Sequence, residues 1–405
     1  MDAQVATKQR AFTASAQGTV GGVVLGGDYQ GLGITRSLGR KGVPVFIVDN
    51  ERSIARFSRY CAGFEKCMDL RDPDATIGAL LEIGNRHQLH GWVLYPTRDE
   101  HVAAFSRHRE ELEKVFRVPT PPFEIIEWAW DKRKTYNLAR DLDIPIPRTH
   151  CFKDASQLAE LDSVEPPFAI KPAIKEHFIY ATKAKAWCAN NHAELKELFE
   201  RAAAIVGPEE VLVQEVIPGG GSQQLSYCAF FRDGEAVGKM VARRRRQHPL
   251  QFGRASTYVE TIDVPLIEEL SERFLRAVGY YGLVEVEYKL DPRNSQYKLL
   301  DFNARTWGYH SLGMRAGVDF PYMLYADQLG SDVQPCRARA GLSWVRMTTD
   351  IPASMMAILG GDLNLRGYLA SLRSCNVEAV FSVQDPMPGL AELALIPYLA
   401  VKKGF

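Results

Sequence analysis

The sequence predicts an α/β protein in which an N-terminal β/α region precedes two mixed regions of strands and helices. Three observations carry this prediction: a strand–turn–helix–strand unit at residues 20–49, a short apolar strand at 166–172, and a β-hairpin at 283–302. The chain has 405 residues, of which 46% are hydrophobic. A chain of this size can bury substantial cores and is expected to fold as two or three domains.

Charge and cysteine content exclude several classes of protein. Lysine plus arginine and aspartate plus glutamate each number 49, so no net charge favours binding to nucleic acid or to an anionic membrane. The seven cysteines are scattered without a CxxC pair, which indicates reduced thiols in a cytoplasmic protein. Residues 1–19 lack the apolar stretch of a signal peptide and are expected to form a flexible tail. No segment has the roughly 18 apolar residues that a transmembrane helix needs.

The first region begins with a β-α-β unit. Residues 20–25 are predicted to form a buried strand, followed by a glycine-rich turn at 26–33, a helix ending at Arg40, and a second strand that ends at Asp49. This pattern belongs to an open parallel sheet of the Rossmann type. An alternative interpretation is a nicotinamide dinucleotide site, since an acidic residue ends the second strand. However, the glycines counted from Gly27 fall at +4 and +6, which does not fit G-x-G-x-x-G.

Further β/α elements continue to a proline-rich boundary at residues 119–122. A helix is predicted near 74–87, a strand at 91–95, and a second helix from Thr97 to Leu112. Thr97 and Glu100 have the spacing of a capping box, which predicts that the Thr97 side chain caps this helix.

The second region contains two lysines next to regular elements. One predicted helix starts after residue 122, carries Asp131 and Lys132, and is closed by the prolines of residues 144–147. Lys171 stands where the apolar strand 166–172 emerges, and an ammonium fixed there suits phosphate oxygens. A helix at 192–206 then leads to an apolar strand at 211–217, followed by three glycines.

The third region contains two predicted hairpins and a helix at 265–278. The first hairpin, 225–241, runs into four consecutive arginines at 243–246. No aromatic residues are interleaved with these arginines, so nucleic-acid binding is not favoured. Strand alternation places Arg244 and Arg246 on the same face, where a guanidinium could bind phosphate or carboxylate through two hydrogen bonds.

The second hairpin, 283–302, gathers oxygen donors at the ends of two strands. Alternation places Glu287 on one face of the first strand, and Asp301 and Asn303 share a face of the second. Two carboxylates and an amide carbonyl in apolar strands form the hard-oxygen cluster that Mg²⁺ prefers when phosphates supply its other ligands. Mn²⁺ could use the same donors.

These motifs, in this order, resemble the ATP-grasp superfamily, most closely its carboxylate–amine ligase branch. The resemblance covers roughly residues 20–330 and includes a D-K helix, an I-K-P strand, a Q-E-x-I-P-G segment and a final D-x-N-x-R. It implies an ATP-grasp fold with an N-terminal Rossmann-like (pre-ATP-grasp) domain, two α+β lobes that clasp the nucleotide, and a C-terminal extension. The implied boundaries are 20–122, 123–210, 211–335 and 336–405.

The resemblance also implies roles for individual residues. ATP phosphates would contact two lysines, adenine would lie against a hinge, the ribose would meet a glutamine, and magnesium would bind the hairpin oxygens. Two arginines would stabilise the transferring phosphate or the substrate carboxylate. In that order these residues are Lys132 and Lys171; Gln214, Glu215 and Ile217; Gln223; Glu287, Asp301 and Asn303; and the catalytic Arg305 and Arg246.

One segment departs from the family pattern. ATP-grasp enzymes usually have a glycine-rich loop over the phosphates after the I-K-P strand, whereas residues 173–178 contain no glycine. The lid must therefore differ, and Lys175, Lys183 and Lys185 could compensate for it.

The implied activity is that of an ATP-dependent carboxylate–amine ligase, which forms an amide through an acyl phosphate and releases ADP and phosphate. Its partners would be a small carboxylate and an amine, amino acids among them, and a homodimer is compatible with the sequence. Two alternatives stay open: an NAD(P)-binding oxidoreductase, and an ATP-grasp module that binds nucleotide without catalysis. The role of residues 336–405 is open as well, since they could cap the cleft or bind the acceptor.

Overall fold

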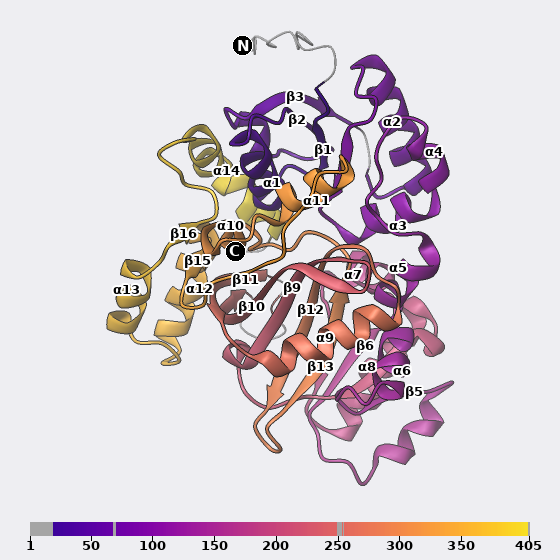
Figure 1. The fold of residues 1–405 in the computed structure, drawn as a ribbon. Helices are drawn as coiled ribbons and strands as arrows, with labels where there is room; N and C mark the ends of the chain where they lie inside the picture. The colour runs from indigo at the N-terminus through magenta and orange to yellow at the C-terminus, as the bar shows by residue number, and fades with distance from the viewer. Residues whose placement is uncertain (1–18, 68–69, 249–252, 254, 404–405) are drawn as a thin grey trace, which may run out of the picture.

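The computed structural model describes residues 19–67, 70–248, 253 and 255–403. It contains three β-sheets with helices packed around them (Figure 1). The predicted tail of residues 1–19 lies outside the described residues, apart from Thr19. Within the described ranges, no helix combines the length and the apolar character needed to cross a membrane.

The first sheet is parallel, with strand order β3-β2-β1-β4. Successive residues of β1 and β2 enter two different hydrophobic cores, one on each face, as in a parallel sheet covered on both sides. The Asp28 carboxylate caps α1 by accepting a hydrogen bond from the Tyr29 backbone N–H. The elements are β1 Gly22–Leu25, α1 Tyr29–Gly39, β2 Val45–Asp49, β3 Cys61–Lys66, α2 Pro73–Arg86, β4 Val93–Pro96, α3 Asp99–Arg107 and α4 Arg109–Glu113, with a 3₁₀ turn at Ala55–Phe57.

The capping box predicted for the helix after β4 is wrong. The Thr97 hydroxyl donates to the Leu25 carbonyl at 2.5 Å, and α3 begins at Asp99 with Arg98 as its N-cap residue. A buried carbonyl at the end of β1 needs a donor, and this long-range requirement outweighs the local capping pattern. As a result Asp99 becomes the first helical residue, at the carboxyl end of the sheet.

The second sheet is antiparallel, with strand order β5-β8-β6-β7. Helix α8 packs on β6 and β8 and closes a small apolar core. Strand β8, which lies just after the implied boundary at residues 210 and 211, pairs with β5 and β6 and so belongs to this sheet. The elements are β5 Thr149–Cys151, β6 Phe168–Pro172, α7 Lys175–Thr182, β7 Trp187–Ala189, α8 His192–Val206 and β8 Val211–Glu215, with 3₁₀ turns at Ala155–Leu161 and Pro208–Glu210.

The helix predicted to carry Asp131 and Lys132 is in fact two helices, α5 Phe123–Trp130 and α6 Lys132–Asp141. Asp131 lies between them in an extended conformation, and its carboxylate caps α6 by accepting from the Arg133 N–H at 2.9 Å. Aspartate is a favoured N-cap, so the helix restarts here. The break makes Lys132 the first residue of α6, and its backbone N–H donates to the Ala173 carbonyl next to β6.

The third sheet has eight strands, in the order β13-β12-β9-β10-β11-β15-β16, with β14 paired to β10. Strands β14 to β16 come from the predicted C-terminal extension, so this segment completes the sheet. The elements are β9 Gln224–Arg232, β10 Glu235–His248, β11 Ala255–Ile262, α9 Pro265–Ala277, β12 Gly282–Asp291, β13 Gln296–Asn303, α10 Ser311–Ala316, α11 Phe320–Gln328, β14 Cys336–Arg337, β15 Ser343–Val345, α12 Met347–Leu359, α13 Leu365–Arg373, β16 Val377–Glu378 and α14 Met387–Lys403, with a 3₁₀ turn at Gly221–Gln223 before β9.

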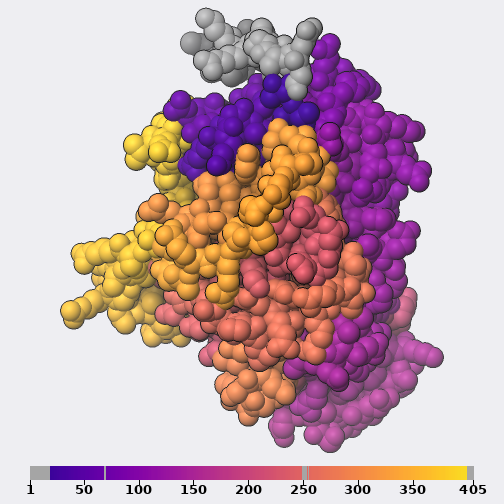
Figure 2. Space-filling model, viewed as in Figure 1, coloured from indigo at the N-terminus to yellow at the C-terminus, as the bar shows by residue number. Residues whose placement is uncertain are grey.

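The C-terminal segment also packs against the N-terminal sheet (Figure 2). Asp385 accepts hydrogen bonds from the Arg36 side chain, the Ser58 hydroxyl and the Arg59 backbone N–H, at 2.8 to 2.9 Å. The Arg36 and Asp385 side chains are only 6% and 1% exposed, so this ion pair is shielded from water. This buried ion pair, together with hydrogen bonds from Arg36 to the Ala379 and Val380 carbonyls, joins the C-terminal segment to the N-terminal region.

Candidate functional site

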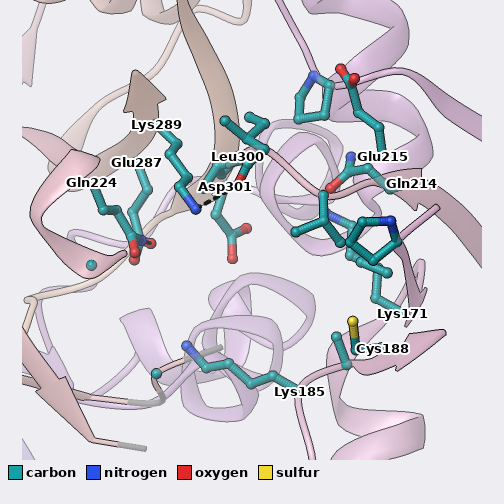
Figure 3. Close-up of a pocket in the computed structure, with 18 of the residues that line it drawn as sticks. Lys171, Lys185, Cys188, Gln214, Glu215, Gln224, Glu287, Lys289, Leu300 and Asp301 are labelled. Atoms are coloured by element: carbon teal, nitrogen blue, oxygen red, sulfur yellow. Dashed lines mark hydrogen bonds between the residues drawn. The ribbon is translucent and has the colours of Figure 1, made fainter. Parts of the chain in front are cut away.

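A cavity of about 590 Å³ lies between the second and third sheets. Side chains enter it from both sides: Lys171 from β6 and Lys185 from the loop before β7 face Glu287 of β12 and Asp301 of β13 (Figure 3). Lys171 and Asp301 thus face one common cavity, which is the arrangement that the sequence-based interpretation requires.

The acidic side of the cavity is built by the β12–β13 pairing. Glu287 and Asp301 are direct partners across the two antiparallel strands. Asp301 forms an ion pair with Lys132 across the interface, while Glu287 accepts a hydrogen bond from Gln224 and lies 3.6 Å from Arg244. Burial alone would raise the pKa of Asp301, but the ammonium groups of Lys132, Lys175 and Lys185 together outweigh it and hold this pKa below its usual range.

Asn303 and Arg305 continue this line of polar groups into the first sheet. The Arg305 guanidinium donates to Asn303 Oδ1 at 3.3 Å and to Asp99 Oδ1 at 2.7 Å. Asp99 also pairs with Lys175, the first residue of α7. One carboxylate from the first sheet therefore links a lysine near the second sheet to an arginine of the third.

Glu285 lies behind Asn303 and is almost completely buried. Tyr309 donates a hydrogen bond to Glu285 Oε1 at 2.6 Å, and the Asn303 amide lies 3.5 Å from Oε2. Burial, followed by repulsion from the Glu287 carboxylate, raises the pKa of Glu285 to about 7. Strand alternation places Glu285 on the face of Glu287, but only the fold shows that it is shielded from water.

The predicted hinge lines the opposite end of the cavity. Gln214 donates its side-chain amide to Thr149 at 2.7 Å, and Glu215 accepts from Lys298 at 2.6 Å. The Ile217 carbonyl accepts from Lys289 at 2.8 Å. Apolar surface from Pro147, Pro167, Ala169, Val216 and Leu300 borders these groups. This end can therefore enclose a flat apolar ring between polar backbone and side-chain groups.

Four predicted site residues do not line this cavity: Gln223 and Arg246 lie away from it, while Asn303 and Arg305 line two other pockets. Gln223 ends a 3₁₀ turn and lines a separate surface depression, while its neighbour Gln224 reaches the cavity and bonds Glu287. Arg246 pairs with Asp350 at 2.7 Å and stacks over two tyrosine rings, away from the cavity lining. A β-bulge in β10 at residues 244–247 shifts the register here, so regular alternation does not apply.

The sequence missed Asp99 and Gln224 as parts of the site, and it indicated Lys175 only as one of three lysines that could compensate for the absent glycine-rich loop. Asp99 follows β4, and the carboxyl end of a parallel strand is a common position for site residues, so a signal existed. Lys175 and Gln224 have no local signal, because their partners are distant in sequence.

The oxygen-bearing side chains of this site can hold a magnesium ion only if ligands from a bound molecule complete its coordination shell. Within the described ranges, no three histidine, cysteine, aspartate or glutamate side chains are grouped so as to hold a metal. Glu287, Asp301 and the Asn303 amide oxygen are hard donors on paired strands, and Mg²⁺ accepts such partial sets when phosphates complete its shell.

No protein-family model matches the chain. The chain is 24% identical over 227 residues to a D-aspartate ligase of Enterococcus faecium (strain Aus0004), a match that covers 53% of each protein. The chain thus spans about half the length of this curated relative.

Several solved structures are similar to about four fifths of this chain. The biotin carboxylase domain of Hydrogenobacter thermophilus 2-oxoglutarate carboxylase, solved with MgADP, has a TM-score of 0.63 at 14% identity, over 80% of this chain and 73% of that one. N5-carboxyaminoimidazole synthetase of Staphylococcus aureus, complexed with ADP, has a TM-score of 0.61 at 13% identity, over 80% of each chain.

The L-amino acid ligase of Bacillus licheniformis has a TM-score of 0.59 at 15% identity, over 78% of this chain and 77% of that one. These neighbours are ATP-grasp ligases. The three sheets, the cavity between two of them and these likenesses together show that the chain has the ATP-grasp fold.

Proposed function

We propose that the protein is an ATP-dependent carboxylate–amine ligase. One observation carries the proposal: Lys132 and Lys171, which belong to one side of the cleft, line the same cavity as Glu287 and Asp301 from the other. Phosphoryl transfer needs little from a protein beyond positioning and charge neutralisation, and this cavity supplies both kinds of charge. The partial match to a D-aspartate ligase supports the same class of reaction.

The nucleotide would lie along the cavity from the hinge to the acids. Adenine fits the apolar end beside Gln214, Glu215 and Ile217, and the phosphates extend toward Lys171 and Lys132. The Lys171 ammonium lies 2.5 Å from the Tyr136 hydroxyl, which orients it within the cavity. Two ammonium groups near the α and β phosphates offset the charge that would otherwise repel a second anion.

A magnesium ion would be held by Glu287, Asp301 and the Asn303 carbonyl oxygen. When bound, it would supply charge neutralisation at the β and γ phosphates. The chain must first release Asp301 from Lys132, since the two side chains are paired without ligand. Phosphate oxygens are natural replacements, because the ammonium can exchange one anionic partner for another.

The chemistry follows from the charges. A carboxylate oxygen of the substrate attacks the γ-phosphorus, and the bond to the ADP oxygen breaks, leaving an acyl phosphate and ADP. The amine then attacks the acyl carbon, phosphate leaves with the bonding electron pair, and the amine loses a proton. Arg305 stands beside the predicted metal donors, where its guanidinium can stabilise the transferring phosphate.

Arg244 replaces Arg246 in this proposal as the β10 arginine at the anionic end. Its guanidinium is buried, donates to Gln224 at 3.0 Å and lies beside Glu287. Arg246 would instead hold the C-terminal helices through Asp350.

The oxidoreductase alternative loses its main support. Asp49, the acid on which a dinucleotide site would depend, accepts the Gly27 N–H at 2.7 Å and the Glu51 N–H at 3.1 Å. Its carboxylate is thereby committed to shaping the glycine-rich turn.

The test is ADP release by the full chain across panels of carboxylates, amino acids included, and amines, with mass spectrometry of the products. We expect ADP release that requires magnesium and both substrates, and its abolition by Asp301→Asn and Lys171→Ala with unchanged circular dichroism. Matched controls are Asp141→Asn and Lys196→Ala, which alter exposed residues. Nucleotide binding without ADP release in any combination would favour the non-catalytic module; full turnover in both site variants would remove the assignment.

A further inference from the structure

Five lysines line the cavity, and four of them already have protein partners. Lys132 pairs with Asp301, Lys171 donates to Tyr136, Lys175 pairs with Asp99, and Lys289 donates to the Ile217 and Gly219 carbonyls. Among the described residues, the fifth, Lys185, has no hydrogen-bond or ion-pair partner. A cation left without a partner in a protein cavity indicates a missing anion.

Lys185 comes from the segment that stands where the family pattern has a glycine-rich loop. After β6 the chain forms α7, leaves it at Lys183 in the left-handed conformation with φ of +57°, and enters β7 at Trp187. The first residue of α7 is held by Asp99, so the segment is fixed at its start. Its far end carries Lys185 into the cavity.

The side chain points across the cavity toward the acidic strands (Figure 3). The charged groups that act on it are Glu287 and Asp301, which attract the ammonium, and Lys175 and Arg244, which repel it. Burial is the largest influence and lowers the pKa of Lys185 to about 8. The Lys185 side chain is partly buried and has no hydrogen-bond or ion-pair partner among the described residues, and an anion bound in the cavity would supply one.

The position of Lys185 limits which anion it can meet. It faces the predicted magnesium donors rather than the hinge, so a nucleotide running from hinge to acids would bring its terminal phosphates there. Lys171 and Lys132 lie on the path to the inner phosphates.

We propose that Lys185 is a ligand of the β and γ phosphates and replaces the backbone N–H groups of the missing glycine-rich loop. This assignment rests on the proposed function, because it requires a nucleotide in the cavity. In this chain, the phosphates would then be covered by one charged side chain on a segment that α7 holds in place. In the family pattern, they are covered by the backbone N–H groups of a loop.

The experiment is calorimetric titration of the full chain, at pH 7 with magnesium, with AMP, ADP and a non-hydrolysable ATP analogue. Lys185→Met should weaken the binding of the ATP analogue and of ADP by about 10- to 100-fold, the range expected for one hydrogen bond to a charged group. The affinity for AMP should stay unchanged. Lys185→Arg should restore most of the affinity. Lys196→Met is the matched control, because Lys196 is exposed on α8 and does not line the cavity.

Each outcome has one meaning. If the wild-type chain binds none of the three nucleotides, the proposed function fails. If it binds them and Lys185→Met binds equally well, the Lys185 assignment fails while the proposed function stands. Equal weakening of AMP and of the ATP analogue, or failure of Lys185→Arg to recover binding, would also overturn the assignment. Circular dichroism of Lys185→Met confirms that the comparison is between folded proteins.

Discussion

Asp99 is the residue whose replacement tests the assembled site most clearly. Its carboxylate accepts from Arg305 at 2.7 Å and pairs with Lys175, and its side chain is 19% exposed. Asp99→Asn keeps the shape but removes the charge, and its amide would direct N–H groups at one of the two cations. Each hydrogen bond to a charged group contributes roughly 1.5–3 kcal/mol, and breaking a buried pair costs roughly 3–5 kcal/mol. We expect the variant to lose about 3 kcal/mol of unfolding free energy.

The assay is urea denaturation followed by circular dichroism, for wild type, Asp99→Asn and the exposed control Asp141→Asn. Burial raises the pKa of Asp99, but the charges of Arg305 and Lys175 outweigh it and hold this pKa well below its usual range. A carboxyl whose folded pKa is depressed contributes stability above its unfolded pKa and loses it as the pH falls through the folded value. The difference between wild type and variant should therefore be constant from pH 5 to pH 8. A loss below 1 kcal/mol, or a loss equal to that of the control, would refute the reasoning.

Three further predictions concern stability and the C-terminal segment. Asp385→Ala should lower the unfolding free energy, measured by urea denaturation, by about 3–5 kcal/mol, because the buried Arg36 loses its carboxylate partner and keeps only backbone carbonyls. An unchanged unfolding free energy would contradict a stabilising role for this ion pair. Arg246→Met should lower the midpoint of urea denaturation, because it leaves the Asp350 carboxylate buried without its arginine partner. The affinity for MgADP, measured by calorimetry, should stay unchanged. A large loss of this affinity would show that Arg246 does belong to the nucleotide site. Burial lowers the pKa of His101 to about 3, so its stabilising contribution is present above pH 6.5 and is lost toward pH 3. Between pH 7 and pH 5, the unfolding free energy of His101→Leu should therefore fall by about 2 kcal/mol less than that of the wild type. If the unfolding free energies of the two proteins change with pH in parallel, His101 is not the titrating group.

Much of the fold was predictable because its signals are local. Apolar strands, glycine turns and amphipathic helices predicted three of the four strands of the first sheet and the hairpin of β12 and β13 to within a few residues, whereas β3 was not predicted. The hairpin pattern predicts that Glu287 and Asp301 lie near each other on adjacent strands. Their direct pairing also needs a register shift between Glu287 and Tyr288, which regular alternation does not predict.

Local sequence patterns alone could not predict that Lys132 and Lys171 line the same cavity as Glu287 and Asp301. Lys132 and Asp301 are 169 positions apart, and only the order of motifs shared with ATP-grasp proteins suggested that they meet. The roles given to individual site residues stay predictions until binding and turnover are measured.

The remaining differences arise from interactions between distant segments. The Thr97 hydroxyl donates to a carbonyl of β1 and does not cap its own helix. A bulge in β10 places Arg246 away from the cavity where alternation predicts it. Asp99 has no local sign of the arginine that it binds 206 positions later. Strands β14 and β16 are two residues long, too short for alternation to reveal, although they complete the large sheet.

The most direct test of the central claim is positional isotope exchange in ATP labelled with oxygen-18 at the β–γ bridge. Acyl-phosphate formation frees the β-phosphate of ADP to rotate, so the label scrambles if ADP then returns to ATP within the site. With magnesium and the carboxylate substrate identified by ADP release, but no amine, we predict scrambling in the wild-type chain and none in Asp301→Asn. Amide formation by the wild-type chain without any scrambling, or scrambling that persists in Asp301→Asn, would contradict a triphosphate held between Lys171 and Asp301.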